Sequence, residues 1–221
     1  MSPKSRITRK EMKEDKLVTL AFRMDELFQK YTNQVLVGVG IIAVIVIAAY
    51  FFLNSRANED RQAGALLSRA SLELKVGNSQ QAVNGLEMII RRYPGTESSK
   101  KAIFLLADAY FQANDLQNAK DAFEKYFLQG KDPLLRASAQ AGIAQCYLQM
   151  GDFSSAGESF LKAAATSQAG FLKKDYLFNA AWVLSKTEQK EKAKQIYRQV
   201  IEEFPESPQA QKSKLALAEM S

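Results

Sequence analysis

The stretch AIFLLADAYFQANDLQNAKDAFEKYFLQG, residues 102–130, reads as two helical segments separated by the turn-forming pair Asn114-Asp115. Small and large residues stand at fixed positions in it, and the same positions recur through the chain at a period of 37 residues. The first small position is Ala70, Ala107, Ala144 and Ala181, the second is Ala82, Ala119, Ala156 and Ala193, and the large position is Leu86, Phe123, Phe160 and Tyr197. A fixed period of this kind is typical of proteins built from stacked repeats.

Each repeat is predicted to be a pair of helices. Small residues let two helix backbones approach, and the large residue fills the space beside the crossing. The first helices are expected near 57–76, 98–113, 134–150 and 171–186, and the second near 79–92, 116–129, 153–166 and 189–204. Gly77-Asn78, Asn114-Asp115 and Gly151-Asp152 supply turns, whereas 186–188 lacks that chemistry. The sequence therefore predicts an all-α solenoid of about four hairpins, closed by a capping helix over 207–220.

These residues resemble the tetratricopeptide repeat, in which a small residue in the first helix precedes an Ala in the second and a bulky residue four positions later. Tyr110 and Tyr147 match the aromatic residue of the first helix, and Pro94 and Pro205 match the proline that ends a unit. The chain departs from the pattern in its longer period and in four residues: Glu73 and Leu184 replace the aromatic, and Lys131 and Gln168 replace the proline.

The resemblance implies that the first helices line a concave binding groove. By phase, the protein-binding residues are expected to be Leu67, Leu74, Lys101, Phe104, Asp108, Phe111, Gln145, Leu148, Asp175, Phe178 and Trp182. One interpretation is a groove for extended or partly unfolded polypeptide, anchored by its aromatic residues. The other is that the aromatic residues pack against the capping helix or a second copy of the chain, as a homo-oligomer. The Lys/Asn clamp with which some tetratricopeptide domains hold a terminal carboxylate is not evident.

The stretch VLVGVGIIAVIVIAAYFFL, Val35 to Leu53, has 19 residues and no charge. As a helix it spans roughly 28 Å, close to the hydrocarbon core of about 30 Å in a membrane. The alternative is a cleaved signal peptide. Against it, 34 residues precede the stretch, the run is longer than the usual 7–15 or so residues of a signal, and no clear small-residue cleavage site follows. The sequence therefore predicts a single, permanent transmembrane helix.

Basic residues flank this stretch unevenly. Residues 1–34 contain eight Lys/Arg, and only Arg56 and Arg61 follow closely on the other side. Because Lys/Arg-rich flanks stay in the cytoplasm, the N-terminus is predicted to be cytoplasmic and the repeats to lie on the other side of the membrane. The arm before the stretch begins with a capping-box pattern, Thr8-Arg9-Lys10-Glu11, and continues as an amphipathic helix. That helix suits either the lipid surface or a membrane partner.

Composition excludes several classes of function. The chain has no His and one Cys, Cys146, so intrachain disulfides, the usual zinc sites and catalysis by a histidine base are excluded. Cys146 is expected to be a small buried side chain. The net charge of +6 is divided equally between residues 1–34 and 56–221, without the basic patch of a nucleic-acid binder. With no recognisable catalytic, metal or cofactor motif, we expect no enzyme activity, cofactor or nucleic-acid partner.

The whole layout is similar to the YfgM-like family of bacterial inner-membrane proteins, including the segment DELFQKYTNQVLVGVG, residues 25–40, that leads into the membrane. The resemblance implies an arm over 1–34, a transmembrane helix over 35–53 and a repeat domain over 54–221. It also implies an accessory of the Sec translocon or of periplasmic chaperones, with translocon subunits, a chaperone or exported polypeptides as partners. The alternative is an envelope scaffold for outer-membrane or cell-wall assembly. The unit that ends in FPESPQA, residues 204–210, resembles the repeat units of tetratricopeptide proteins in outer-membrane assembly.

Overall fold

The computed structural model describes residues 9–220, with the side chains of residue 34 and of 36–220. Every regular element in that part of the chain is an α-helix. The elements are α1 (Arg9–Lys75), α2 (Ser79–Arg92), α3 (Glu97–Gln112), α4 (Leu116–Gln129), α5 (Pro133–Gln149), α6 (Phe153–Thr166), α7 (Gly170–Leu184), α8 (Lys190–Glu203) and α9 (Pro208–Glu219). The chain divides into two parts, Met1–Ser55 and Arg56–Ser221.

The first part contains the apolar stretch of α1. Its large apolar side chains from Leu36 to Leu53 are between 56% and 67% exposed, so no other described element covers them. The most apolar window of the candidate span that begins at Leu36 has a mean hydropathy of 2.8. By length and composition α1 is therefore able to cross a membrane. The predicted capping box and the amphipathic face of the arm lie outside the described residues and side chains.

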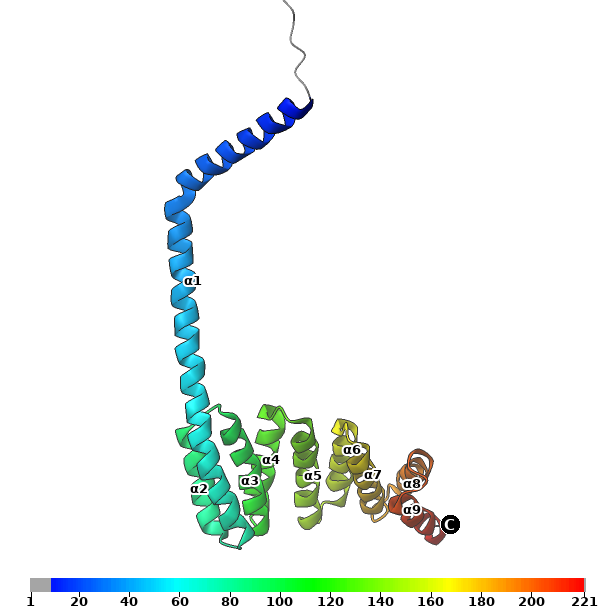
Figure 1. Ribbon diagram of the computed structural model, residues 1–221. Coiled ribbons are helices and arrows are strands. Elements are labelled where there is room, and N and C mark those ends of the chain that lie inside the picture. The colour runs from blue at the N-terminus through cyan, green and yellow to red at the C-terminus, as the bar shows by residue number, and fades with distance from the viewer. Residues whose placement is uncertain (1–8, 221) are drawn as a thin grey trace, which may run out of the picture. The chain divides into compact units, whose positions relative to one another are not determined.

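The second part is a series of antiparallel helical hairpins. Each helix from α2 onward packs against the next along the chain, and Figure 1 shows α2 to α9 following one another in order. Contacts between α3 and α5 join the first helices of the second and third repeats, and contacts between α7 and α9 join the first helix of the fourth repeat to the capping helix. The predicted helices of this part end within two residues of those observed, and α9 is the expected capping helix. The all-α solenoid predicted from the 37-residue period is confirmed.

The turns inside the first three hairpins share one backbone conformation, in which a residue with positive φ follows the first helix. Gly77, Asn114 and Gly151, spaced by 37 residues, have φ values of 84°, 59° and 82°. Glycine and asparagine tolerate this left-handed conformation, which reverses the chain after the first helix. In the second and third of these turns the next residue caps the following helix: the carboxylates of Asp115 and Asp152 accept hydrogen bonds from the backbone N–H groups of Asn118 and Ser155.

The fourth turn uses a threonine instead. The Thr187 hydroxyl donates to the carbonyl of Leu184 at 2.8 Å and accepts from the backbone N–H of Gln189 at 3.0 Å. This single side chain therefore joins the end of α7 to the beginning of α8. The hairpin predicted at 186–188 forms without the glycine, asparagine or aspartate found in the other three turns.

Close packing at small residues holds neighbouring helices together. The eight alanines of the two small positions are at most 4% exposed, and the residues at the large position are at most 3% exposed. Gly142 of α5 extends this rule, since a Cβ there would lie 2.6 Å from the ring of buried Phe123 in α4. Close packing of the helices therefore requires small side chains at these crossings as well as buried apolar surface.

We predict that Gly142→Ala destabilises the repeats by roughly 1–3 kcal/mol, although alanine favours helix over glycine by about 1 kcal/mol. The added methyl group has no room against the Phe123 ring. Gly64→Ala is the matched control, because its Cβ would stand 3.4 Å from the Ser98 hydroxyl, an ordinary contact, and it should be neutral or stabilising. Urea unfolding of the full chain in mild detergent, followed by circular dichroism, measures both. Equal stability of the two variants would contradict the prediction.

Candidate protein-binding groove

The first helices of successive repeats place equivalent residues side by side. Asp108 on α3, Gln145 on α5 and Trp182 on α7 are each 37 residues apart and occupy the same position in their helices. Asp108 is half-buried, Gln145 is exposed, and 43% of the Trp182 surface remains accessible. In this row of equivalent positions, the packing of the repeats leaves Gln145 and Trp182 accessible and Asp108 partly accessible.

A pocket of about 340 Å³ opens along this row. Its walls come from α3, α5, α6 and α7, and its lining residues are Phe111, Gln145, Leu148, Gln149, Phe160, Asn179, Trp182 and Val183. Four of them, Phe111, Gln145, Leu148 and Trp182, are among the residues predicted for the groove. Their role in binding remains a prediction. The pocket combines apolar walls with side-chain amides, which is the usual composition of a site for a small apolar group carried on a polar chain.

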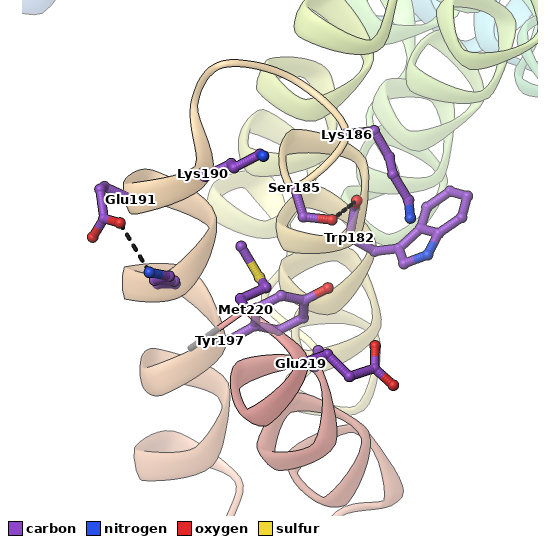
Figure 2. Close-up of a pocket in the computed structure, with 10 residues that line it drawn as sticks. Trp182, Ser185, Lys186, Lys190, Glu191, Tyr197, Glu219 and Met220 are labelled. Atoms are coloured by element: carbon purple, nitrogen blue, oxygen red, sulfur yellow. Dashed lines mark hydrogen bonds and ion pairs between the residues drawn. The ribbon is translucent and has the colours of Figure 1, made fainter.

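Trp182 also borders a second pocket, of about 460 Å³, toward the C-terminal end of the repeats. Figure 2 shows it with Lys186 from the turn after α7, with Lys190 and Tyr197 from α8, and with Glu219 and Met220 at the end of α9. The Lys186 ammonium lies 5.9 Å from the centroid of the indole ring. Trp182 thus lines both the first pocket and a second one that contains Lys186, Lys190 and Lys194.

Two of the predicted aromatic residues make ring contacts with neighbouring helices. The Phe104 ring meets Phe123 and Tyr126 of α4 edge-on, with centroids 5.6 and 5.4 Å away. The Phe178 ring lies 5.8 Å from that of Tyr197, and the ammonium of Lys212 in α9 is 6.0 Å from its centroid. Phe104 thus packs against the second helix of its own hairpin, which neither interpretation specified, whereas Phe178 has a contact with the capping helix α9, as the alternative interpretation describes.

The remaining predicted groove residues are dispersed. Leu74 is buried in the core of the first hairpin, and Leu67 packs against the same core. Lys101 is exposed on α3. The Asp175 carboxylate accepts a hydrogen bond from the Gln209 amide of α9. The structure does not bring these four residues to the pocket.

The pocket also contains four residues that were not predicted: Gln149, Phe160, Asn179 and Val183. Gln149 follows Gln145 by one helical turn, and Asn179 precedes Trp182 by three residues, so helical periodicity alone places both on the predicted face. Phe160 is the large residue of the third repeat and was assigned entirely to the core. The prediction from helical phase selects one row of residues on each first helix. A pocket between helices is also lined by residues from a second row and from the neighbouring second helix, such as Phe160.

Asp108 is the one acidic residue in the row. Burial raises the pKa of its carboxyl from 3.8 to about 6. Among the described residues, no side-chain hydrogen bond or ion pair reaches Asp108. By contrast, burial raises the pKa of the Cys146 thiol to about 11, which keeps it protonated and unreactive at neutral pH.

We predict that Asp108→Asn stabilises the protein at about pH 8 by roughly 1–2 kcal/mol and has little effect near pH 4. A carboxyl with a raised folded-state pKa binds its proton more tightly in the folded chain, so ionisation opposes folding. The penalty is absent below about pH 4 and complete above about pH 6. Urea unfolding of the full chain in detergent at both pH values measures it. Glu158→Gln, on the exposed surface of α6, is the control and should change stability equally little at each pH.

Several known folds share this arrangement. The crystal structure of MamA is 18% identical, covers 63% of this chain and 77% of its own, and superposes with a TM-score of 0.54. A tetratricopeptide repeat protein from Parabacteroides merdae is 13% identical, with coverage of 70% and 58% and a TM-score of 0.58. The apo quorum sensor NprR from B. thuringiensis is 16% identical, with coverage of 71% and 47% and a TM-score of 0.56. At these identities the likeness concerns the fold alone.

The family comparison is more specific. No curated protein sequence matches the chain. A tetratricopeptide repeat model matches residues 175–207, and the model of the tetratricopeptide repeat-like domain matches residues 26–176, more than half of the chain. Repeats of this type generally act as protein-binding scaffolds without catalysis of their own, which gives the chain its general role. The protein belongs to the tetratricopeptide repeat-like domain family.

Proposed function

We propose that the protein is a membrane-anchored scaffold of the YfgM-like kind, an accessory of the Sec translocon or of periplasmic chaperones that binds exported polypeptides. The observation that carries the proposal is the pocket at Trp182, a residue whose surface is 43% accessible, on a chain that also contains a helix apolar enough to cross a membrane. An indole left exposed in a preformed apolar pocket is typical of a binding hot spot. A membrane span in the same chain suits a partner that is itself at the membrane.

The proposed topology has a cytoplasmic arm over 1–34, a span over 35–53 and a periplasmic repeat domain over 54–221. The exposed apolar side chains between Leu36 and Leu53 support it, because they require a hydrocarbon or protein environment. The excess of Lys/Arg before the span gives the direction. Emerging polypeptides would then meet the groove on the side to which they are exported.

Single-cysteine labelling tests this topology. Because Cys146 is buried and its thiol pKa is raised, a cysteine introduced elsewhere is the main reactive site. Leu128→Cys, at an 81% exposed position on α4, should react with a membrane-impermeant maleimide in intact spheroplasts. Ser5→Cys should react only after lysis. The reverse pattern would place the repeats in the cytoplasm and contradict the proposal.

Removing the pocket aromatics tests the groove. Phe111→Ala with Trp182→Ala should lose the co-purifying partners of the tagged full chain in mild detergent while leaving it folded, because both side chains line the pocket. Phe104 is left intact, since its ring belongs to the packing of α3 on α4. Mass spectrometry of the eluates identifies the partners, and circular dichroism checks the fold.

The matched control is Leu128→Ala with Phe171→Ala, two exposed apolar residues outside the pocket, which should retain every partner. Translocon subunits or a membrane-tethered chaperone with the wild type would support the proposed role. Outer-membrane or cell-wall assembly proteins in their place would favour an envelope scaffold and reject the translocon assignment.

A further inference from the structure

The carboxylate of Asp108 has no cationic partner among the described residues. Its carboxyl is half-buried on α3, and no described residue pairs with it or donates a side-chain hydrogen bond to it. It precedes Phe111, which lines the pocket, by three residues on the same helix, and residues so spaced lie on one face about 5–6 Å apart. A desolvated carboxylate without a partner is unfavourable, and a bound cation relieves that penalty.

The polar groups inside the pocket are of a different kind. Gln145, Gln149 and Asn179 contribute three side-chain amides to its lining. Among the described residues, none of the three has a side-chain hydrogen-bond partner. Each amide offers a carbonyl acceptor and an N–H donor, which match the N–H and C=O groups of an extended peptide backbone. They hold a backbone without selecting its side chains, so selectivity must come from the apolar pocket and from Asp108.

We propose that the groove selects extended peptide segments in which an aliphatic or aromatic side chain fills the pocket beside Trp182 and a Lys or Arg pairs with Asp108. The inference rests on the proposed function and narrows its ligand class. Neighbouring packed helices lie about 8–10 Å apart, and an extended chain advances about 3.3 Å per residue. The pocket beside Trp182 extends over one to two such spacings from Asp108, about 8–20 Å, so the basic residue and the apolar anchor are separated by about three to six residues.

Direct binding of designed peptides to the full chain in mild detergent tests this selectivity. The probes are fluorescein-labelled peptides of about 12 residues on a Gly/Ser/Thr background, with both termini blocked to remove their charges. One carries a Leu and, about four residues away, a Lys; the others replace Lys by Gln, Lys by Glu, or Leu by Ser. Each peptide is made in two versions, with the Leu or Ser position either N-terminal or C-terminal to the Lys, Gln or Glu position. Anisotropy gives the affinity at about pH 7.5, above the pKa of Asp108. The emission of Trp182, the only Trp in the chain, reports occupancy of the pocket.

The peptide with Leu and Lys should bind about tenfold more tightly than the Leu and Gln peptide, as expected for a charge-assisted contact at a partly exposed site. The Glu peptide should bind most weakly of the Leu peptides. In Asp108→Asn the preference for Lys should disappear while the affinity for the Leu and Gln peptide is unchanged. Glu158→Gln, an exposed acid on α6, is the matched control and should keep the preference. Trp182→Ala should weaken the binding of every Leu peptide. Because binding to detergent does not depend on Trp182, this variant also shows how much of the signal comes from the detergent.

Equal affinity for Lys and Gln peptides, or an equal loss of both in Asp108→Asn, would overturn the inference and leave the groove as an apolar peptide site. Binding that survives in Trp182→Ala would place the peptides elsewhere and would also overturn it. Failure of every peptide to bind rejects the ligand class, whereas the scaffold role is judged separately by the partners that co-purify with the wild-type chain. Tighter binding of the Glu peptide would reverse the charge assignment.

Discussion

Two helix backbones approach closely in every repeat because a small residue stands on each side of their crossing. Alanines occupy these positions in all four hairpins, and they are almost completely buried. A buried large residue four positions later fills the space that the small pair leaves. This pairing of small with large volumes fixes the distance between helices and, since it recurs every 37 residues, it also fixes the phase of each repeat relative to the next. Equivalent residues of successive first helices consequently form a row.

The phase relation explains how the pocket arises. The pocket opens beside Gln145 and Trp182, which the packing of the helices leaves partly accessible, and Asp108 stands at the equivalent position of α3. One turn away the same helices carry Phe104 and Phe178, whose rings are occupied in contacts with α4, α8 and α9. Aromatic residues on one helix face thus divide between packing and an open site according to whether a neighbouring helix reaches them. The groove is therefore a local pocket toward α7, and the first hairpin contributes Leu67 and Leu74 to its own core instead.

The sequence predicted the fold closely because the repeat is a property of volume and period. Helix positions followed from the alanines, the large residues and three turns whose glycine or asparagine has positive φ. The site was predicted only in part, since helical phase identifies a face but does not show which side chains another helix covers. Phe104 and Phe111 share that face, yet only Phe111 lines the pocket. The fourth turn shows the same limit: Thr187 forms it through two hydrogen bonds that no turn motif indicated.

Two residues that this packing leaves partly accessible, Trp182 and Asp108, are unfavourable for the stability of the folded chain. An indole with 43% of its surface accessible gives up part of the stabilisation that burial would provide, and a half-buried carboxylate without a cation opposes folding once ionised. Both stand at a position where Gln145 shows that a neutral polar residue fits equally well. Departures from local stability that occur along one groove are characteristic of functional sites, where a ligand supplies the missing contacts. Under the proposed function, a partner that contacts the accessible part of Trp182 and the carboxylate of Asp108 supplies them.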